Sequence, residues 1–276
     1  MKSPADARGC SRGDRIALFA GGGKLPLEIF EKLAQKGIPT LVISFGSEIE
    51  GNVGGIHEII HLENLDLPRI LGAILDSGIK TVLLAGNVPK GVVFTGKGLD
   101  GGTMEMITRL ESMDDHALLG AVVDRIESFG VRVVRYMDLI PELLVPDGYM
   151  PGREPSVSEK RDIAYGLPII RSMLPFSFGQ SIVVSRCSVV AVEAMEGTDS
   201  TVRRAGTLGT GGTLMKMMRV DQDERFDIPT VGPVTLELMK EAGLTCLALE
   251  TGRTIILERE HFEKLLRDHD IAVVGV

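Results

Sequence analysis

The chain of 276 residues contains no tryptophan and only three cysteines. Cys10, Cys187 and Cys246 lie far apart and form no Cys-x-x-Cys motif, which argues against a disulfide framework and indicates a reducing compartment. No run of about 18 apolar residues is present, and residues 1–15 contain no apolar stretch long enough for a signal peptide. These absences predict a soluble, cytoplasmic protein.

An excess of basic residues is lacking as well. The net charge of −8 and the isoelectric point near 5.3 oppose a broad surface that neutralises many phosphates, so nucleic acid is not expected as a partner. Hydrophobic residues make up 44% of the chain and charged residues 25%, as in ordinary globular proteins. A chain of this length accommodates one large domain or two modest ones.

The first half alternates short apolar runs with amphipathic segments. Apolar runs at 15–20, 39–45, 81–85 and 131–137 predict strands. Amphipathic segments between these runs predict helices, and the helical segment before residue 131 is expected to bend near residue 114. Such alternation is typical of a parallel sheet covered by helices on both faces. We therefore expect an α/β chain with an N-terminal Rossmann-like domain.

A proline-rich segment interrupts this alternation. Residues 138–155 contain four prolines and two glycines, which is typical of a linker, so we divide the chain into domains 1–140 and 141–276. The second half predicts another α/β domain with a mixed, partly antiparallel sheet. Its expected helices are 157–174, 233–242 and 260–268, and its expected strands are 181–185, 189–195, 213–218, 245–250, 254–258 and 271–276.

The stretch HEIIH at residues 57–61 matches the zinc-peptidase pattern His-Glu-x-x-His, which requires a helix. It follows two glycines, contains two adjacent isoleucines and leaves little room for a helix before Pro68. A strand is the better interpretation, and it places Glu58 on the face opposite His57 and His61. A zinc site is therefore not expected here.

Gly21, Gly22, Gly23 and Lys24 follow the first expected strand, where a nucleotide-binding fold places its phosphate-binding turn. The dinucleotide fingerprint is incomplete, because Pro26 occupies the position of its third glycine. Three interpretations remain open: NAD, another phosphorylated ligand, or only a tight turn.

Two further loops resemble anion sites. Asn87 and Lys90 follow the strand at 81–85, where ligands of open parallel sheets gather, although a simple capped turn explains them equally well. Residues 91–98 resemble a P-loop, but Gly98 stands where the Mg²⁺-binding Ser or Thr belongs. ATP hydrolysis by this loop is not expected.

The densest cluster of charges lies in the second half. Glu196 and Asp199 close an expected strand, and Arg203 and Arg204 follow on an expected turn. Carboxylates hold Mg²⁺ and arginines clamp phosphate, so the four side chains fit a phosphate site. The alternative is that Asp199 caps a helix and pairs with Arg203 at i,i+4.

Two more residues are candidates for the chemistry. Lys216 follows the glycine-rich run 209–213 and offers another anion contact. Asp227 lies between Phe226 and Ile228, in a locally apolar setting where a carboxylate is costly without a partner. A metal ion or an activated water would be such a partner.

Taken in order, these motifs resemble the LpxI-type UDP-2,3-diacylglucosamine pyrophosphatase family of lipid A biosynthesis. The matching stretches are IALFAGGGKLPLEI, GNVPKGVVF, DDHALLGAVVD, VEAMEGTDSTVRRAG, the GG-x-L-x-K at 211–216, RFDIPTVGP and TLELMKEAGL. They cover nearly the whole chain from residue 15 onward, and the ordered set is far more specific than any single motif.

The resemblance implies Mg²⁺-dependent hydrolysis of UDP-2,3-diacylglucosamine to UMP and 2,3-diacylglucosamine 1-phosphate. It makes Asp227 the essential acidic residue and places Glu196 and Asp199 near the metal or the phosphates, with Asp227 and Asp199 as metal ligands. Asp115 and Thr230, inside matched motifs, are assigned to substrate binding. Arg203, Arg204 and Lys216 are expected to clamp phosphate, and residues 21–24 to hold the nucleotide.

Further expectations concern partners and alternatives. The substrate is a lipid-linked UDP-sugar, so we expect peripheral contact with the inner membrane surface, and enzyme base rates suggest a homodimer. Because aromatic residues are few, aliphatic and methionine side chains should line any groove for the acyl chains. A non-catalytic nucleotide-sugar-binding protein and an NAD-dependent oxidoreductase are the competing interpretations.

Overall fold

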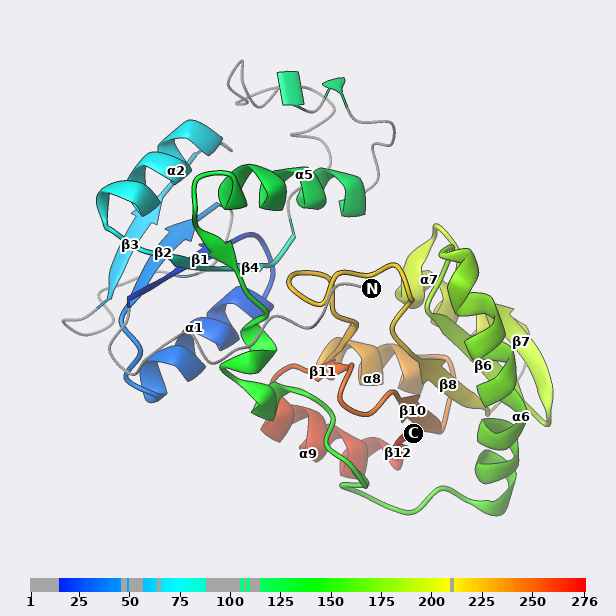
Figure 1. Ribbon diagram of the computed structural model, residues 1–276. Coiled ribbons are helices and arrows are strands. Elements are labelled where there is room, and N and C mark those ends of the chain that lie inside the picture. The colour runs from blue at the N-terminus through cyan, green and yellow to red at the C-terminus, as the bar shows by residue number, and fades with distance from the viewer. Residues whose placement is uncertain are drawn as a thin grey trace. The chain divides into compact units, whose positions relative to one another are not determined.

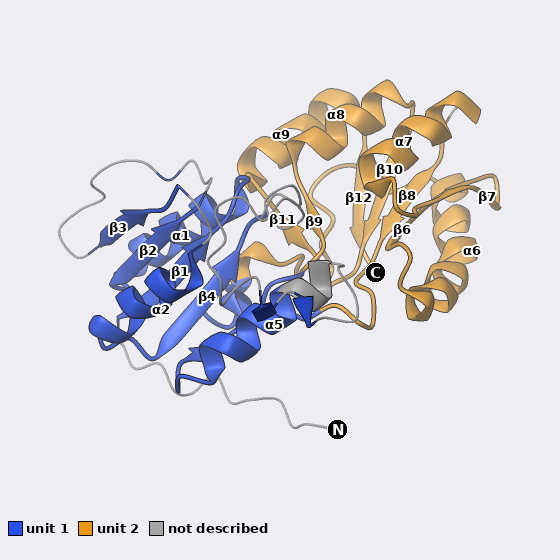
Figure 2. Ribbon diagram, turned by 90° about the horizontal axis from the view of Figure 1, so that it is seen from above, with its two compact units in different colours: residues 1–141, 223–227 blue, residues 142–222, 228–276 orange. Residues whose placement is uncertain are grey.

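The computed structural model divides into two compact units (Figure 2). Unit 1 contains residues 1–141 and 223–227, and unit 2 contains residues 142–222 and 228–276. Sequence analysis did not anticipate that five residues of the second half belong to unit 1. The structure describes the ranges 15–45, 49, 57–63, 66–87, 105–106, 108–109, 115–208 and 211–276.

Unit 1 is built on a five-stranded parallel sheet with the order β3-β2-β1-β4-β5. This confirms the predicted Rossmann-like sheet. The strands are β1 (Ile16–Ala20), β2 (Thr40–Ser44), β3 (Glu58–His61), β4 (Thr81–Ala85) and β5 (Arg132–Val133), and the helices are α1 (Leu25–Gln35), α2 (Leu67–Asp76) and α5 (Asp115–Glu127).

Both faces of this sheet are covered, as Figure 1 shows. Helix α1 packs against β1 and β2 on one face. On the other face, side chains such as Phe19 and Ile43 form one buried cluster with Ile74 of α2 and Ile126 of α5. Three central strands are buried along their whole length, which explains why they read as continuous apolar runs and not as alternating patterns.

The segment HEIIH forms a strand, as predicted, and Glu58–His61 pairs with β2. Glu58 binds Arg15 through an ion pair of 2.6 Å, while the ring of His57 packs edge-on against Phe30 at 5.2 Å. Burial lowers the pKa of His57. This geometry is not that of a helical His-Glu-x-x-His zinc site.

The strand predicted at 131–137 is shorter in the structure. Strand β5 ends at Val133, and Tyr136–Asp138 forms a 3-10 turn instead. Asp138 closes that turn by accepting two hydrogen bonds from Arg135, at 2.6 and 3.2 Å. A charged pair at i,i+3 favours a turn over an extended chain, and the apolar run of the sequence concealed it.

Unit 2 contains a mixed five-stranded sheet with the order β12-β10-β8-β6-β7, as predicted. Strands β8, β10 and β12 are parallel, and β6 runs antiparallel to both β8 and β7. The strands are β6 (Ser181–Ser185), β7 (Ser188–Val192), β8 (Thr213–Lys216), β10 (Cys246–Leu249) and β12 (Ala272–Gly275), with a separate pair β9 (Thr230–Val231) and β11 (Ile255–Ile256). The helices are α6 (Val157–Met173), α7 (Gly197–Leu208), α8 (Pro233–Glu241) and α9 (Arg259–His269).

Alternate residues of this sheet enter two different cores. Val183 and Leu214 face α7, α8 and α9, whereas Ile182 and Met215 face α6. Gly166 lets α6 approach the sheet, because a Cβ atom there would overlap the sulfur of Met215. None of the helices in the described part of the chain is long and apolar enough to cross a membrane.

One helix of unit 2 was expected only in the alternative interpretation, in which Asp199 caps a helix. Arg203 and Arg204, expected on a turn, lie within helix α7, and strand β7 ends at Val192, before the residue expected. The sequence concealed this helix because its buried stripe consists of Thr201, Val202 and Ala205, which are small or polar. The buried stripe is therefore only weakly hydrophobic.

A buried ion pair fixes the start of α6. Ser156 and Glu159 form a capping box, and Arg153 donates two hydrogen bonds of 2.8 Å to the Glu159 carboxylate. Arg153 also donates to the carbonyl oxygens of Thr245 and Asp270, the residues directly before β10 and shortly before β12. The pair therefore joins the helix to the sheet.

This pair predicts a defined acid sensitivity. Burial alone would raise the pKa of Glu159, but hydrogen bonds from Arg153, Thr245 and Ser156 lower it to about 2. A carboxylate whose folded-state pKa is depressed adds stability above about pH 4.3, its unfolded pKa, and that stability is lost as the pH falls toward 2. Between about pH 4.3 and about pH 2, the free energy of unfolding measured in urea should fall by about 2 kcal/mol less for Glu159→Gln than for the wild type. Equal losses would contradict the assignment, and Glu154→Gln, an exposed carboxylate, is the matched control.

Candidate functional site

The glycine turn of unit 1 lies where the strand order of the sheet reverses. Strand β1 lies between β2 and β4, and the residues that follow β1 and β4 meet. Gly21 donates its amide hydrogen to Ala85 (2.8 Å), and Gly22 exchanges two backbone hydrogen bonds with Asn87, of 2.8 and 2.9 Å. Ligands of open α/β sheets bind at such reversal points.

Glycine is required at two positions for this close contact. A Cβ atom on Gly21 would lie 2.7 Å from the carbonyl oxygen of Asn87. Gly86 has φ +89°, and a Cβ atom there would lie 2.6 Å from Cγ of Pro26. The amides of Gly21 and Gly22 are thus already bonded. Within the described ranges, no acceptor is found for the amides of Gly23, Leu25 and Leu27, and they are donors left for an anion.

The segment 223–227 forms a compact turn within unit 1. The carbonyl oxygen of Asp223 accepts the amides of Phe226 and Asp227, and its carboxylate accepts four hydrogen bonds from the Arg225 side chain and backbone amide at 2.6 to 3.0 Å. Phe226 packs against the core that α2 and α5 share with the sheet. These contacts fix the position of Asp227.

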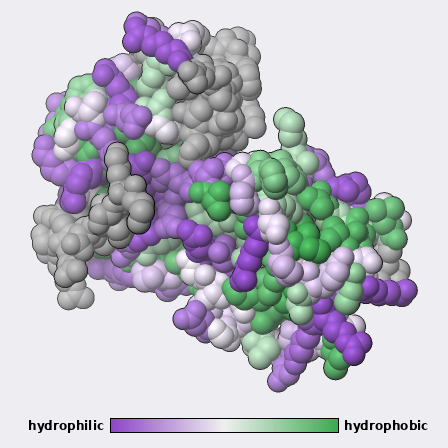
Figure 3. Space-filling view, turned by 45° about the vertical axis from the view of Figure 1, so that its right-hand side comes forward, coloured by the Kyte–Doolittle hydropathy of each residue, from purple (hydrophilic) through white to green (hydrophobic). Residues whose placement is uncertain are grey.

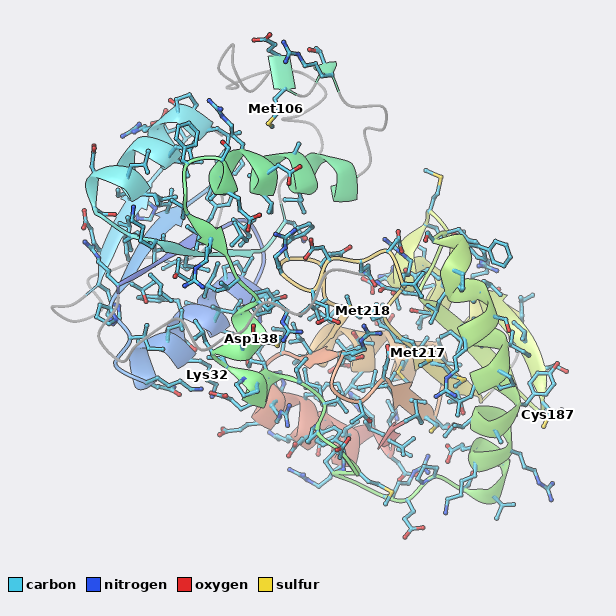
Figure 4. All side chains as sticks on the ribbon, in the orientation of Figure 1. Lys32, Met106, Asp138, Cys187, Met217 and Met218 are labelled. Carbon is cyan, nitrogen blue, oxygen red and sulfur yellow. The ribbon has the colours of Figure 1, made fainter. Side chains whose placement is uncertain are left out.

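Asp227 is partly buried beside Tyr136. Burial, and then the negative charge of Asp227, raises the pKa of Tyr136, which stays protonated. The hydroxyl of Tyr136 is buried without a hydrogen-bond partner among the residues described. Arg135, the neighbour of Tyr136, is held between Asp138, labelled in Figure 4, and Glu224. The turn that carries Asp227 is therefore attached directly to the end of β5.

In unit 2 the polar side chains collect at the carboxyl ends of the parallel strands. Lys216 ends β8, is only 7% exposed, and donates a hydrogen bond of 2.9 Å to the carbonyl oxygen of Thr230. Burial lowers the pKa of Lys216, and the negative charges of Glu193 and Asp199 oppose that effect. A buried ammonium is costly unless opposite charges compensate it, and Glu193 and Asp199 supply such charges.

Sequence analysis missed Glu193. Its carboxylate is 6% exposed and accepts hydrogen bonds from the Thr198 hydroxyl (3.1 Å) and the Gln180 amide (3.4 Å). The sequence signal is a glutamate directly after an apolar strand, at the edge of the sheet where ligands of α/β proteins bind. The predicted strand 189–195 contains this glutamate, and the sequence prediction assigned no chemistry to it.

The two arginines of α7 differ in their contacts, because in the described part of the chain only Arg204 binds Glu196. Arg204 donates to the Glu196 carboxylate (2.7 Å) and to the carbonyl oxygen of Val192 (2.8 Å). A hydrogen bond from its own amide, and then the one from Arg204, lowers the pKa of Glu196. Arg203 is exposed, and the described residues contain no ion pair between it and Asp199, which was the simpler interpretation of this motif. Arg203 is the more accessible cation.

The remaining candidate residues for substrate binding lie on both units, and some of them fall outside the described residues. Thr230 uses its carbonyl oxygen for Lys216 and donates its hydroxyl to Ile228 at 3.1 Å. Lys24 and Asn87 are exposed. Asp115 begins α5, but its side chain lies outside the described part, as do Lys90 and the P-loop-like stretch 91–98. Across the ranges given above, no three His, Cys, Asp or Glu side chains form a metal-binding group.

Comparison with known proteins covers both halves of the chain. The family model of the LpxI N-terminal domain matches residues 15–143, and that of the LpxI C-terminal domain matches residues 146–274. A protein of Caulobacter vibrioides named UDP-2,3-diacylglucosamine pyrophosphatase LpxI is 28% identical over 281 residues, covering 95% of this chain and 97% of that protein.

One solved structure is similar at a much lower level. L-threonine dehydrogenase from Phytophthora infestans is 10% identical, with a TM-score of 0.29 over 52% of this chain and 41% of that one, and it carries no weight here. The two family models, by contrast, follow each other in order along this chain and together span nearly all of it. The chain belongs to the LpxI family.

Proposed function

We propose that the protein hydrolyses the pyrophosphate bond of UDP-2,3-diacylglucosamine, giving UMP and 2,3-diacylglucosamine 1-phosphate. The observation that carries the proposal is membership of the LpxI family across both halves, together with the relative named for this reaction. The placement of acidic and basic side chains at the carboxyl ends of both sheets supports it, because a phosphoanhydride needs charge neutralisation and a water made nucleophilic.

In the proposed reaction, water attacks one phosphorus and the bond from that phosphorus to the bridging oxygen breaks. Asp227 accepts the proton of the attacking water. Its position supports this role, because it is partly buried next to the buried, protonated Tyr136, on a turn held by backbone hydrogen bonds to Asp223.

The cationic residues of unit 2 supply the phosphate contacts. Arg203, exposed on α7, clamps phosphate oxygens directly, and Arg204 holds Glu196 in place. Lys216 is hydrogen-bonded to the carbonyl oxygen of Thr230, and the negative charges of Glu193 and Asp199 act on its ammonium. In unit 1, the Gly23 amide and the side chains of Lys24 and Asn87 are the candidate contacts to the nucleotide.

Magnesium fits the donors that are available. The described residues offer separate carboxylates and no three-acid cage, and Mg²⁺ typically uses one or two carboxylates with water and substrate phosphates. Asp227 and Asp199 are the proposed ligands. When bound, Mg²⁺ neutralises phosphate charge and lowers the pKa of water.

Replacing Asp227 tests the proposed base. Asp227→Asn should lower kcat for UMP release by about 100-fold to 10,000-fold, because proton transfer in the transition state is lost. The matched control is Glu224→Gln, a neighbouring carboxylate that pairs with Arg135 and should retain kcat. If Asp227→Asn turns over like wild type, Asp227 is not the base. If the wild type binds substrate without releasing UMP, the protein is a binding protein and not this enzyme.

Removing the divalent metal tests the cofactor. Chelation with EDTA should abolish UMP release, and added Mg²⁺ should restore it, because the phosphate charge is otherwise not neutralised. The Tm, measured in parallel, separates loss of cofactor from unfolding. Full activity in excess EDTA would contradict the Mg²⁺ assignment.

The buried Lys216 ammonium and the buried Glu193 carboxylate are expected to attract each other. Lys216→Met should destabilise the protein by about 1 to 3 kcal/mol, because it leaves the Thr230 carbonyl oxygen without its donor and removes a positive charge that attracts Glu193. Adding Glu193→Gln should recover part of this loss, and a double-mutant cycle in urea measures the coupling directly. Additive effects of the two substitutions would show that the two charges do not interact.

A further inference from the structure

A turn with two exposed phenylalanines precedes β6, at the edge of the unit 2 sheet where the parallel strands end. The short 3-10 helix Leu174–Phe176 is followed by Ser177, whose φ of 59° reverses the chain before β6. Phe176 is 75% exposed and Phe178 is 45% exposed. The proposed function uses neither side chain, and two phenylalanines on one exposed turn require an explanation in a chain with few aromatic residues.

The turn is fixed next to the polar cluster. A Cβ atom on Gly179 would overlap the carbonyl oxygen of Glu193, so the turn closely approaches the residue that follows β7. Two further large apolar side chains are exposed in the loops that follow β7 and β8, namely Met195 and Val220. Exposed apolar groups therefore occur on three connections at one edge of the sheet.

The outer side of α6 continues this surface with positive charge. Both acidic residues of the helix are buried: Glu159 pairs with Arg153, and Asp162 accepts the amide of Cys187, labelled at the β6–β7 hairpin in Figure 4. The exposed charged side chains of α6 are therefore all basic. Arg161 and Arg171 form no ion pair with any residue that the structure describes, although the chain carries a net charge of −8.

A shallow apolar depression connects the helix to the turn. It has a volume of about 480 Å³ and is lined by Pro168, Ile169, Ser172, Met173, Phe176 and Phe178. Figure 3 shows hydrophobic surface gathered on unit 2 with scattered hydrophilic side chains around it. Basic residues next to exposed apolar and aromatic side chains are the signature of a surface that lies on anionic lipid.

We infer that this surface, formed by Arg161, Tyr165, Pro168 and Arg171 of α6 with Phe176 and Phe178, docks on an anionic phospholipid bilayer. The phenylalanines enter the acyl boundary and the arginines bind lipid phosphates. The inference deepens the proposed function and rests on it in one respect: a substrate with two acyl chains must be taken from a bilayer. A two-fold contact between two copies would instead bring the same unpaired arginines together, which costs free energy.

Vesicle flotation of the full chain tests the docking surface. Wild type should bind vesicles of phosphatidylglycerol mixed with phosphatidylcholine and should bind pure phosphatidylcholine weakly. Phe176→Ser with Phe178→Ser should reduce the partition coefficient about tenfold or more, and Arg161→Gln or Arg171→Gln about fivefold each. Val234→Ser, an exposed apolar residue of α8 outside this surface, should bind like wild type.

Three results would overturn the docking surface: no binding of wild type to the anionic vesicles, unchanged binding of the double phenylalanine variant, or a dimer in sedimentation that this variant dissociates. UMP release from substrate in detergent micelles, where no bilayer is needed, is measured on the same proteins and should be unchanged. Vesicle binding without UMP release by wild type would support the surface and reject the proposed reaction. UMP release without vesicle binding would do the reverse.

Discussion

A parallel strand that is buried on both faces tolerates charged side chains only where it ends, and this constraint organises the whole protein. In unit 1 the buried strands β1 and β4 end in the glycine turn and in Asn87. In unit 2 the buried strand β8 ends in Lys216, and β7 ends next to Glu193. Since parallel strands end at the same edge, the polar residues that follow them gather there without any motif that is contiguous in sequence.

The same constraint explains what the sequence could reveal. Buried strands read as apolar runs, so β1, β2, β4, β6 and β8 were recognisable from the sequence. Helix α7 was expected only in the alternative interpretation, because its buried residues Thr201, Val202 and Ala205 are small or polar and do not read as an apolar stripe. The sequence showed which charged residues the proposed site contains, but it did not show which residues they contact.

Two features depend on contacts distant in sequence and could not be derived from local pattern. Glu193 looks like part of an apolar strand until Lys216, 23 positions later, is seen to bury its ammonium nearby. Residues 223–227 lie in the second half of the chain yet belong to unit 1, where Arg225 contacts Glu127 at 3.3 Å and Glu224 binds Arg135. The fold thus assigns Asp227, the proposed base, to the unit that holds the glycine turn.

The central claim is that water cleaves a phosphoanhydride on this protein. The most direct measurement is mass spectrometry of both products after turnover of UDP-2,3-diacylglucosamine in ¹⁸O-labelled water. The account predicts a single labelled oxygen in either UMP or 2,3-diacylglucosamine 1-phosphate, and which product carries it identifies the phosphorus attacked. Products without label, or substrate recovered intact from a folded, magnesium-loaded protein, would contradict the account.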